Sequence, residues 1–393
     1  MPYVENRIIH DADAHTMEPP EWLEGFGSRA VVDYAREHFT IGDNEQAFVE
    51  IDRARALQTD TGFRADAERE VMLRKNYRAH GAWDPTDRSQ TLDYLGFASQ
   101  LVFPSMPNTL LEEMEHTAPA ELTYQTASAA NRAQIAFCAD DPRLLPVAYI
   151  PLQDLERAGP CAGEAIAEGA AALLIPNRMP AGHAQSHVAF DRVWAQAEEA
   201  GIPIVLHVAT PDLVMPPQHR NNGLPVEPDF HGGSENFRSV SYMAISAAPL
   251  QVLSMFVFDG VFERFPQLRV GVIELGAVWV PSFLRQLEAA MDAFERHEQR
   301  LQQLTLRPSD YIHRQVRVTP YPTEPTGWII ENSGPEICMF ASDFPHVEGG
   351  RNPLRRFDRE VEHLSEDTRQ RFYRHNFEDL MGSAVDLEAL GLA

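Results

Sequence analysis

The sequence predicts an α/β fold, a distorted (β/α)₈ TIM barrel with an insertion after the first strand. Eight short apolar runs occur along the chain, and most of them are followed by a helical segment. The runs are apolar at consecutive positions, which is typical of parallel strands covered by helices on both faces. An open doubly wound sheet is the alternative, but no Gly-x-Gly-x-x-Gly follows the first run. We therefore predict a single domain over residues 1–393.

The first predicted strand occupies residues 7–15, where an apolar stretch ends in polar side chains. Residues 16–90 are polar and charged, with weak helical periodicity at 53–78 and a Glu-Pro-Pro break at 18–20. We interpret 16–90 as an insertion that packs over one end of the core. A cap over an active site and a plain surface excursion both fit this composition.

The remaining strands and helices alternate from residue 100 onward. Seven further strands are predicted at 100–103, 144–152, 170–175, 203–208, 268–274, 316–321 and 337–342. Helices are predicted at 112–139, 154–168, 190–200, 240–258, 280–300 and 354–381. Parallel strands joined in this way all point in the same direction, so their carboxyl ends meet at one rim of the sheet.

The composition describes an acidic globular protein, with a formal net charge of -25 and 44% hydrophobic residues. A strongly negative chain argues against nucleic acid or an anionic membrane surface as a partner. A small anionic substrate stays compatible with this charge, because a bound metal ion can dominate the local field. We therefore expect a small-molecule substrate.

Three widely spaced cysteines, Cys138, Cys161 and Cys338, predict small core residues and no disulfide framework or zinc knuckle. The N-terminus lacks a basic segment followed by an apolar run, so no signal peptide is predicted. No apolar stretch approaches the length that spans a bilayer. The expected location is the cytoplasm, with no membrane partner.

Metal-binding or acid/base side chains stand at the carboxyl ends of several predicted strands, where (β/α)₈ enzymes place their catalytic groups. They are Asp13, His15, His207, Glu274 and Asp343. Taken singly, each has a structural explanation, such as a turn carboxylate, a helix cap or a buried histidine satisfied by the core. Taken together, these nitrogen and oxygen donors converge on one rim and suit a single divalent ion plus a spare acid or base.

Two motifs give the sequence a resemblance to a known family. Residues 260–281 read Gly-Val-Phe-Glu-Arg-Phe-Pro-Gln-Leu-Arg-Val-Gly-Val-Ile-Glu-Leu-Gly-Ala-Val-Trp-Val-Pro, and residues 341–346 read Ala-Ser-Asp-Phe-Pro-His. Both resemble signature segments of the amidohydrolase superfamily, in the amidohydrolase-related branch that includes aminocarboxymuconate semialdehyde decarboxylase and γ-resorcylate decarboxylase. The resemblance spans nearly the whole chain and is weakest over 16–90. It implies a metal-dependent TIM-barrel enzyme.

The resemblance implies a metal site made by Asp13, His15, His207 and Asp343. Asp13 stands where many members have histidine, and a carboxylate there favours harder ions such as Mn²⁺ or Mg²⁺. We expect one divalent ion, with Zn²⁺ and Mn²⁺ ahead of Mg²⁺. Glu274 stands where the related decarboxylases have a histidine that handles protons, so it is either an acid/base or a metal ligand. The fourth and fifth predicted strands contain no lysine that could form a carboxylated bridge between two ions.

Substrate-binding candidates come from the segments after the fifth and eighth predicted strands. Arg220 and His231 lie in the long loop 209–240, where an arginine can hold a carboxylate in a bidentate grip. A solvated loop is the plain alternative for both residues. His346 follows Asp343 closely and is expected to touch substrate.

Two enzyme functions are predicted. The first is a metal-dependent lyase that decarboxylates a small aromatic or unsaturated carboxylic acid, with Asp343 or Glu274 as the proton donor. The alternative is a metal-dependent hydrolase of an amide, ester, lactone or C–C bond, in which Asp343 takes a proton from a metal-activated water. A binding protein without catalysis is a third option, which the intact ligand set disfavours. The resemblance also implies a homodimer.

Overall fold

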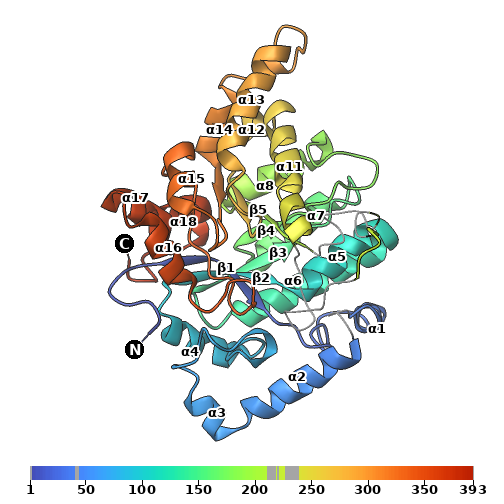
Figure 1. The fold of residues 1–393 in the computed structure, drawn as a ribbon. Coiled ribbons are helices and arrows are strands. Elements are labelled where there is room, and N and C mark those ends of the chain that lie inside the picture. The colour runs from blue at the N-terminus through green and yellow to red at the C-terminus, as the bar shows by residue number, and fades with distance from the viewer. Residues whose placement is uncertain (1, 40–43, 210–217, 219–220, 226–238, 393) are drawn as a thin grey trace.

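The core of the protein is a curled parallel sheet of seven strands arranged in chain order (Figure 1). The computed structural model describes residues 2–39, 44–209, 218, 221–225 and 239–392. The strands are β1 (His10–Thr16), β2 (Ser99–Pro104), β3 (Leu144–Tyr149), β4 (Ala172–Leu174), β5 (Ile204–His207), β6 (Val270–Ile273) and β7 (Val316–Val318). Every neighbouring pair is parallel, so the α/β prediction is confirmed.

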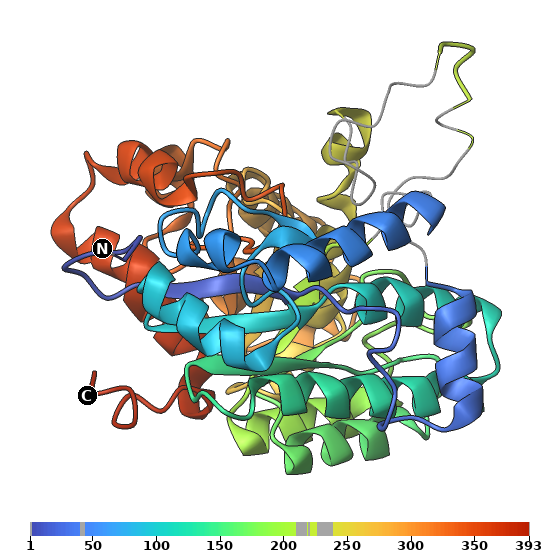
Figure 2. The same ribbon diagram turned by 90° about the horizontal axis from the view of Figure 1, so that it is seen from below.

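Helices follow most of the strands and surround the sheet (Figures 1 and 2). They are α1 (Arg29–Glu37), α2 (Asn44–Gln58), α3 (Thr61–Ala65), α4 (Pro85–Leu95), α5 (Met106–Thr117), α6 (Ala120–Cys138), α7 (Ala158–Glu168), α8 (Asp191–Ala200), α10 (Ser239–Ala244), α11 (Ala247–Phe258), α12 (Val261–Arg264), α13 (Val280–Phe294), α14 (Pro308–Gln315), α15 (Thr326–Ser333), α16 (Pro353–Val361), α17 (Glu366–Gln370) and α18 (Asn376–Met381). The predicted alternation of strands and helices is therefore present.

The strands send alternate side chains into two buried clusters, as the period of an extended chain requires. Val205 and Phe103 belong to one cluster, and the ring centroid of Phe103 is 4.5 Å from that of His207. Leu206, the neighbour of Val205, packs in the other cluster with Trp194 of α8. This alternation places His207 on the same face as Val205, which is the inner face of the curled sheet.

The eighth predicted strand, 337–342, does not form a regular strand, so the prediction of eight strands is corrected to seven. The segment makes isolated parallel bridges on both sides, between Val318 and Cys338 and between Ala14 and Phe344. Backbone hydrogen bonds thus connect it with both edge strands, β7 and β1. A residue with left-handed backbone geometry follows the segment directly and interrupts the ladder.

Residues 16–90 contain α1, α2, α3 and most of α4, and their backbone reaches the carboxyl end of β1. The amide of Asn76 donates to the carbonyl of Pro345 at 2.9 Å. The guanidinium of Arg88, which is fully buried, donates to the carbonyl of His15 at 2.9 Å. These contacts place part of the excursion next to the rim where the candidate catalytic residues stand.

Three long predicted helices are broken in the structure. The prediction at 112–139 is two helices, α5 and α6, which meet at Ala118 and Pro119. Proline has no amide hydrogen and biases its predecessor toward extended geometry, so one helix ends and the next begins there. The segment 240–258 divides into α10 and α11, and 354–381 divides into α16, α17 and α18. Helices α14 and α15 were not predicted.

One helical stretch of the described residues, Ser239–Phe258, has the length and composition of a membrane span, with a mean hydropathy of 1.5. The expectation that no stretch reaches this length is therefore wrong. Part of this stretch packs inside the protein, because Val252, Leu253 and Phe256 of α11 are buried in the core. Core helices of globular proteins meet the same length and composition test.

Candidate metal centre

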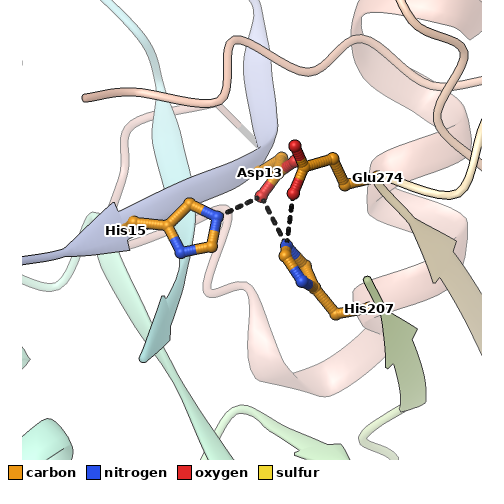
Figure 3. A group of neighbouring side chains, drawn as sticks. All are labelled: Asp13, His15, His207 and Glu274. Atoms are coloured by element: carbon orange, nitrogen blue, oxygen red, sulfur yellow. Dashed lines mark hydrogen bonds and ion pairs between the residues drawn. The ribbon is translucent and has the colours of Figure 1, made fainter. Parts of the chain in front are cut away.

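Four predicted site residues meet at the carboxyl ends of the strands (Figure 3). Asp13 and His15 come from β1, His207 is the last residue of β5, and Glu274 directly follows β6. Each of the four is at most 4% exposed. One potential ligand atom from each lies within 4.8 Å of the others, so residues as far apart in the sequence as Asp13 and Glu274 form one compact donor group.

The spacing within this group matches the ligand shell of one ion. The Nε2 atom of His15 is 3.2 Å from Oδ1 of Asp13. The Nε2 atom of His207 is 3.4 Å from Oδ1 of Asp13 and 3.4 Å from Oε2 of Glu274. Donors bound to a common ion at about 2.1 Å lie about 3.0 to 3.4 Å from each other. The four side chains therefore have the separation that a single divalent ion requires.

The tautomer of His207 supplies a test of whether these residues fit an ion. Its Nδ1 atom is 2.8 Å from the carbonyl oxygen of Val208, and because a carbonyl only accepts, Nδ1 must carry the hydrogen. In the neutral ring, Nε2 then directs its electron pair at the oxygens of Asp13 and Glu274. Electron pairs on a nitrogen and on two carboxylates face one another, and a cation between them makes this arrangement favourable. The donor set fits a divalent ion.

Asp343 lies beside this group and forms a second one with His15 and His346. Its Oδ1 atom is 3.2 Å from Nδ1 of His346 and 3.6 Å from Nε2 of His15. The resemblance implied Asp343 as the fourth ligand and left Glu274 open. In the structure, Glu274 joins the compact set of four, and Asp343 stands next to it.

Glu274 and Asp343 share an uncommon backbone conformation, with φ of 53° at each. At Glu274 the amide donates to Oγ1 of Thr319 at 2.9 Å, and the hydroxyl of Tyr321 donates to the carbonyl at 2.5 Å. At Asp343 the amide donates to the carbonyl of Asp13 at 2.9 Å. Local hydrogen bonds therefore hold both residues in a conformation that non-glycine residues rarely adopt.

Asp11 supports the Asp343 side of the centre from the neighbouring strand. Its carboxylate accepts from the amide of Ser342 at 2.7 Å and from the Ser342 hydroxyl at 2.6 Å. It also accepts from the side-chain amide of Gln100 at 2.8 Å. This carboxylate thus fixes the residue that directly precedes Asp343.

Burial and charge set the protonation of the β1 donors. Burial lowers the pKa of His15 well below its usual value, and the neighbouring His346 lowers it further, so the ring is neutral and can donate an electron pair. A carboxylate that binds a metal ion is ionised, so Asp13 would bind the ion as an anion.

A small pocket begins at these residues. Its lining includes Asp13, Glu274, Asp343 and Tyr321. Further lining comes from Thr319, Pro320, Pro322, Ala341, Ser342, Glu348 and Gly349. The pocket thus combines carboxylates at the candidate metal centre with flat, weakly polar surfaces.

Lys75 is a buried cation near Asp343 that the sequence reasoning did not single out. Its Nζ atom is buried and has no hydrogen-bond partner among the described residues. Burial lowers the pKa of Lys75 to about 8, and the charges of Asp343, Glu348 and Asp11 oppose that shift. Lys75 lies in a stretch rich in charged residues, where no pattern distinguished it from a solvated side chain. Only the fold brings it to the rim.

The remaining predicted substrate-binding residues have different outcomes. Arg220 and His231 lie outside the described residues. His346 is 3% exposed and its ring stacks on that of His15, with centroids 3.9 Å apart. His346 therefore lies next to Asp343 and His15, and its contact with substrate stays a prediction.

A family model described as amidohydrolase matches residues 11–382 of the sequence. The chain belongs to the amidohydrolase family. No curated protein sequence matches it. Membership makes the protein an enzyme, and it agrees with the resemblance carried by the segments 260–281 and 341–346.

Solved structures resemble this amidohydrolase over nearly its whole length. An amidohydrolase from Mycobacterium avium subsp. paratuberculosis has 18% identity and a TM-score of 0.72, covering 96% of this chain and 100% of the other. A 5-carboxyvanillate decarboxylase from Novosphingobium aromaticivorans, complexed with manganese and 4-hydroxy-3-methoxy-5-nitrobenzoic acid, has 16% identity and a TM-score of 0.62, covering 96% of both chains. A 2,6-dihydroxybenzoate decarboxylase from Rhizobium has 15% identity and a TM-score of 0.59, covering 96% and 99%. At these identities the similarity establishes the fold.

Proposed function

We propose that this amidohydrolase is a metal-dependent decarboxylase of a small aromatic or unsaturated carboxylic acid. The observation that carries the proposal is the compact, buried set of two carboxylates and two imidazoles beside a separate acidic residue, Asp343. Solved structures with the same fold include decarboxylases of aromatic acids, some with manganese bound. A donor set with two carboxylates suits Mn²⁺ best among the ions expected from the sequence.

Asp13, His15, His207 and Glu274 would hold the ion. When bound, a divalent ion polarises substrate oxygens and stabilises the negative charge that develops in the transition state. These four side chains have no room for a substrate among them, so the reacting carbon lies in the adjoining pocket.

Asp343 delivers the proton in this proposal. Its carboxyl lines the pocket and contacts the ring of His346 at 3.2 Å. The proton passes from the Asp343 carboxyl to the substrate carbon that bears the carboxylate. The bond between that carbon and the carboxylate carbon then breaks, and carbon dioxide leaves. Tyr321, which lines the pocket, offers a flat surface for the ring. Lys75 interacts electrostatically with Asp343 and adds positive charge on that side of the centre.

The test is release of carbon dioxide from a panel of hydroxybenzoates and muconate-type acids by the Mn²⁺-loaded enzyme. We expect turnover of at least one acid by the wild type and a loss of about 10²- to 10⁴-fold in Asp343→Asn. Absence of carbon dioxide from every acid would contradict the proposal.

A second candidate function is hydrolysis. The observation that favours it is Glu274, a carboxylate at the position where the related decarboxylases have a proton-handling histidine. In this reaction Asp343 takes a proton from a water molecule in the pocket. Release of an amine, alcohol or second acid from amides, esters, lactones or diketones, without carbon dioxide, would support hydrolysis over decarboxylation.

We also propose the finer features of the architecture. The segment 337–344 completes a distorted (β/α)₈ barrel by joining β7 to β1, and 16–90 acts as a cap at the catalytic rim. The active form is a cytoplasmic homodimer. Light scattering of the purified protein tests the last point, because a monomer at all concentrations would contradict it.

A further inference from the structure

The hydroxyl of Ser105 lies among three polar groups at the edge of the centre. Ser105 follows β2 and precedes the first residue of α5. Its Oγ atom is 2.7 Å from the carbonyl of Thr16, 3.0 Å from Nε2 of His346 and 3.4 Å from Nδ1 of His15. A hydroxyl has one hydrogen to donate and two electron pairs that accept, so these three contacts restrict one another.

The hydroxyl of Ser105 donates its hydrogen to the carbonyl of Thr16. A carbonyl oxygen only accepts, and this contact is the shortest of the three. The sulfur of Met17, another acceptor, is 4.0 Å away and accepts weakly. Both ring nitrogens must therefore donate their hydrogens to the serine oxygen, which uses its two electron pairs to accept them.

A neutral imidazole carries a single N–H, so the opposite nitrogens of the two rings present electron pairs. For His15 this is Nε2, which is 3.2 Å from Oδ1 of Asp13. For His346 it is Nδ1, which is 3.2 Å from Oδ1 of Asp343. In both rings the bare nitrogen faces the carboxylates, on the side where an ion would be bound.

We propose that Ser105 is a positioning residue of the metal centre, which selects the ring tautomers of His15 and His346 so that the electron pair of His15 faces the ion and that of His346 faces Asp343. The assignment rests on the proposed metal centre, but it does not depend on whether the reaction is decarboxylation or hydrolysis.

Glu18 holds Ser105 in place. Its carboxylate accepts from the amide of Ser105 at 3.1 Å and from the amide of Met106 at 2.9 Å, and it is only 1% exposed. These bonds satisfy two of the free amides that begin α5. Hydrogen bonds thus run in an unbroken series from a buried carboxylate, through Ser105, to the two histidines.

Removal of the hydroxyl releases the His15 ring from this constraint. Its Nε2 can then carry the hydrogen and donate to Asp13, which places a proton where the ion would bind. Loss of a group that orients a metal-binding histidine typically costs about 10- to 100-fold in metal affinity. A threonine at the same position retains the hydroxyl and should retain most of the affinity.

The experiment measures Mn²⁺ affinity of the full-length protein by competition with a chromophoric chelator. We expect Ser105→Ala to bind about 10- to 100-fold more weakly than wild type, and Ser105→Thr to bind within about threefold of it. Ser333→Ala is the matched control, because Ser333 is buried and donates to the carbonyl of Ile329 at 2.6 Å within α15. If Ser105→Ala does not fold, Ser105→Cys, a weak acceptor of similar size, takes its place.

A second readout follows the tautomer directly. In ¹⁵N-histidine-labelled protein without metal, we expect the assigned His15 ring to be protonated at Nδ1 in wild type and at Nε2 in Ser105→Ala. Unchanged affinity and tautomer in Ser105→Ala, or a Ser105→Thr variant as weak as Ser105→Ala, would overturn the assignment. If wild type binds no divalent ion while its His15 tautomer depends on Ser105, the proposed metal centre is contradicted. The role of Ser105 in setting the His15 tautomer is then still supported.

Discussion

The donors of the centre are held by two different means. Asp13, His15 and His207 are strand residues, so the hydrogen bonds of the sheet fix their backbone. Glu274 and Asp343 come after regular structure ends, each with φ of 53°. The positions of Asp13, His15 and His207 therefore follow from the fold, whereas those of Glu274 and Asp343 depend on a few identifiable side chains.

The left-handed backbone of Glu274 and Asp343 has a small free-energy cost, which is confined to these two residues. A non-glycine residue in left-handed geometry costs about 1 to 3 kcal/mol, which its surroundings must offset. Thr319 and Tyr321 do so for Glu274, and Asp11 does so for Asp343 through Ser342. Substitutions on each side of the centre should therefore have distinguishable effects.

The largest effect is expected on the strand side, from His207→Ala. This change removes a donor that no neighbouring residue can replace, because β5 ends at this position. We expect Mn²⁺ affinity to fall by more than about 100-fold and turnover to be lost with it. Metal analysis of the purified protein measures this, with His187→Ala, an exposed histidine, as the control. Full metal content in His207→Ala would show that the strand donors do not form the site.

The second-largest effects are expected at the two turn residues, Glu274 and Asp343, and they differ in kind. Glu274→Gln removes a charge from the set of four, so we expect about 10- to 100-fold weaker Mn²⁺ binding. Asp343→Asn removes the proton donor, so we expect turnover to fall by about 10²- to 10⁴-fold while Mn²⁺ binding changes little. Titration with the ion and steady-state kinetics on both variants give the comparison. The opposite pattern would make Asp343 the ligand and Glu274 the acid.

A third, smaller effect is expected from Asp11→Asn. The carboxylate accepts from four donors, which are the amide and hydroxyl of Ser342, the side-chain amide of Gln100 and, at 3.4 Å, the amide of Asp13. A single amide oxygen cannot accept from all of them. We expect the free energy of unfolding to fall by about 1 to 3 kcal/mol. We also expect turnover to fall while metal content stays close to one ion, because Asp343 shifts and the strand donors do not. Urea unfolding and metal analysis measure the two quantities, and loss of the ion would contradict this separation.

The smallest effect is expected from Thr319→Val. This near-isosteric change removes the acceptor for the amide of Glu274 and retains the packing of the side chain. One hydrogen bond of this kind contributes about 1 kcal/mol to stability. We expect a loss of that size in urea unfolding and a weakening of Mn²⁺ binding that stays below the effect of Glu274→Gln. An equal or larger loss of affinity would mean that the backbone of Glu274 matters more than its charge.

The difference between strand residues and turn residues also explains how much of the site could be predicted from the sequence. Period-two alternation and the position at strand ends pointed to Asp13, His15 and His207, and the structure brings them together. Glu274 and Asp343 were also singled out, but the pattern could not decide which of them joins the compact set. That choice depends on the turn geometry after each strand, which no periodicity encodes.

The fold was predictable where periodicity is strong and unpredictable where single residues decide. Seven of the apolar runs are strands, but the eighth run continues into left-handed geometry and makes only isolated bridges. Pro119 divides one predicted helix into two. Lys75 and Ser105 reach the centre through tertiary packing, so their sequence neighbours gave no indication of a role.

The buried guanidinium of Arg88 attaches α4 to the rim that carries the centre. Arg88 lies on α4, donates to the carbonyl of His15 at 2.9 Å and has its central carbon 4.9 Å from the ring centroid of Phe344. His15 belongs to β1, and Phe344 directly follows Asp343. One side chain therefore connects the excursion with both segments that carry the β1 donors and Asp343, so a change in the position of α4 would be transmitted to the centre.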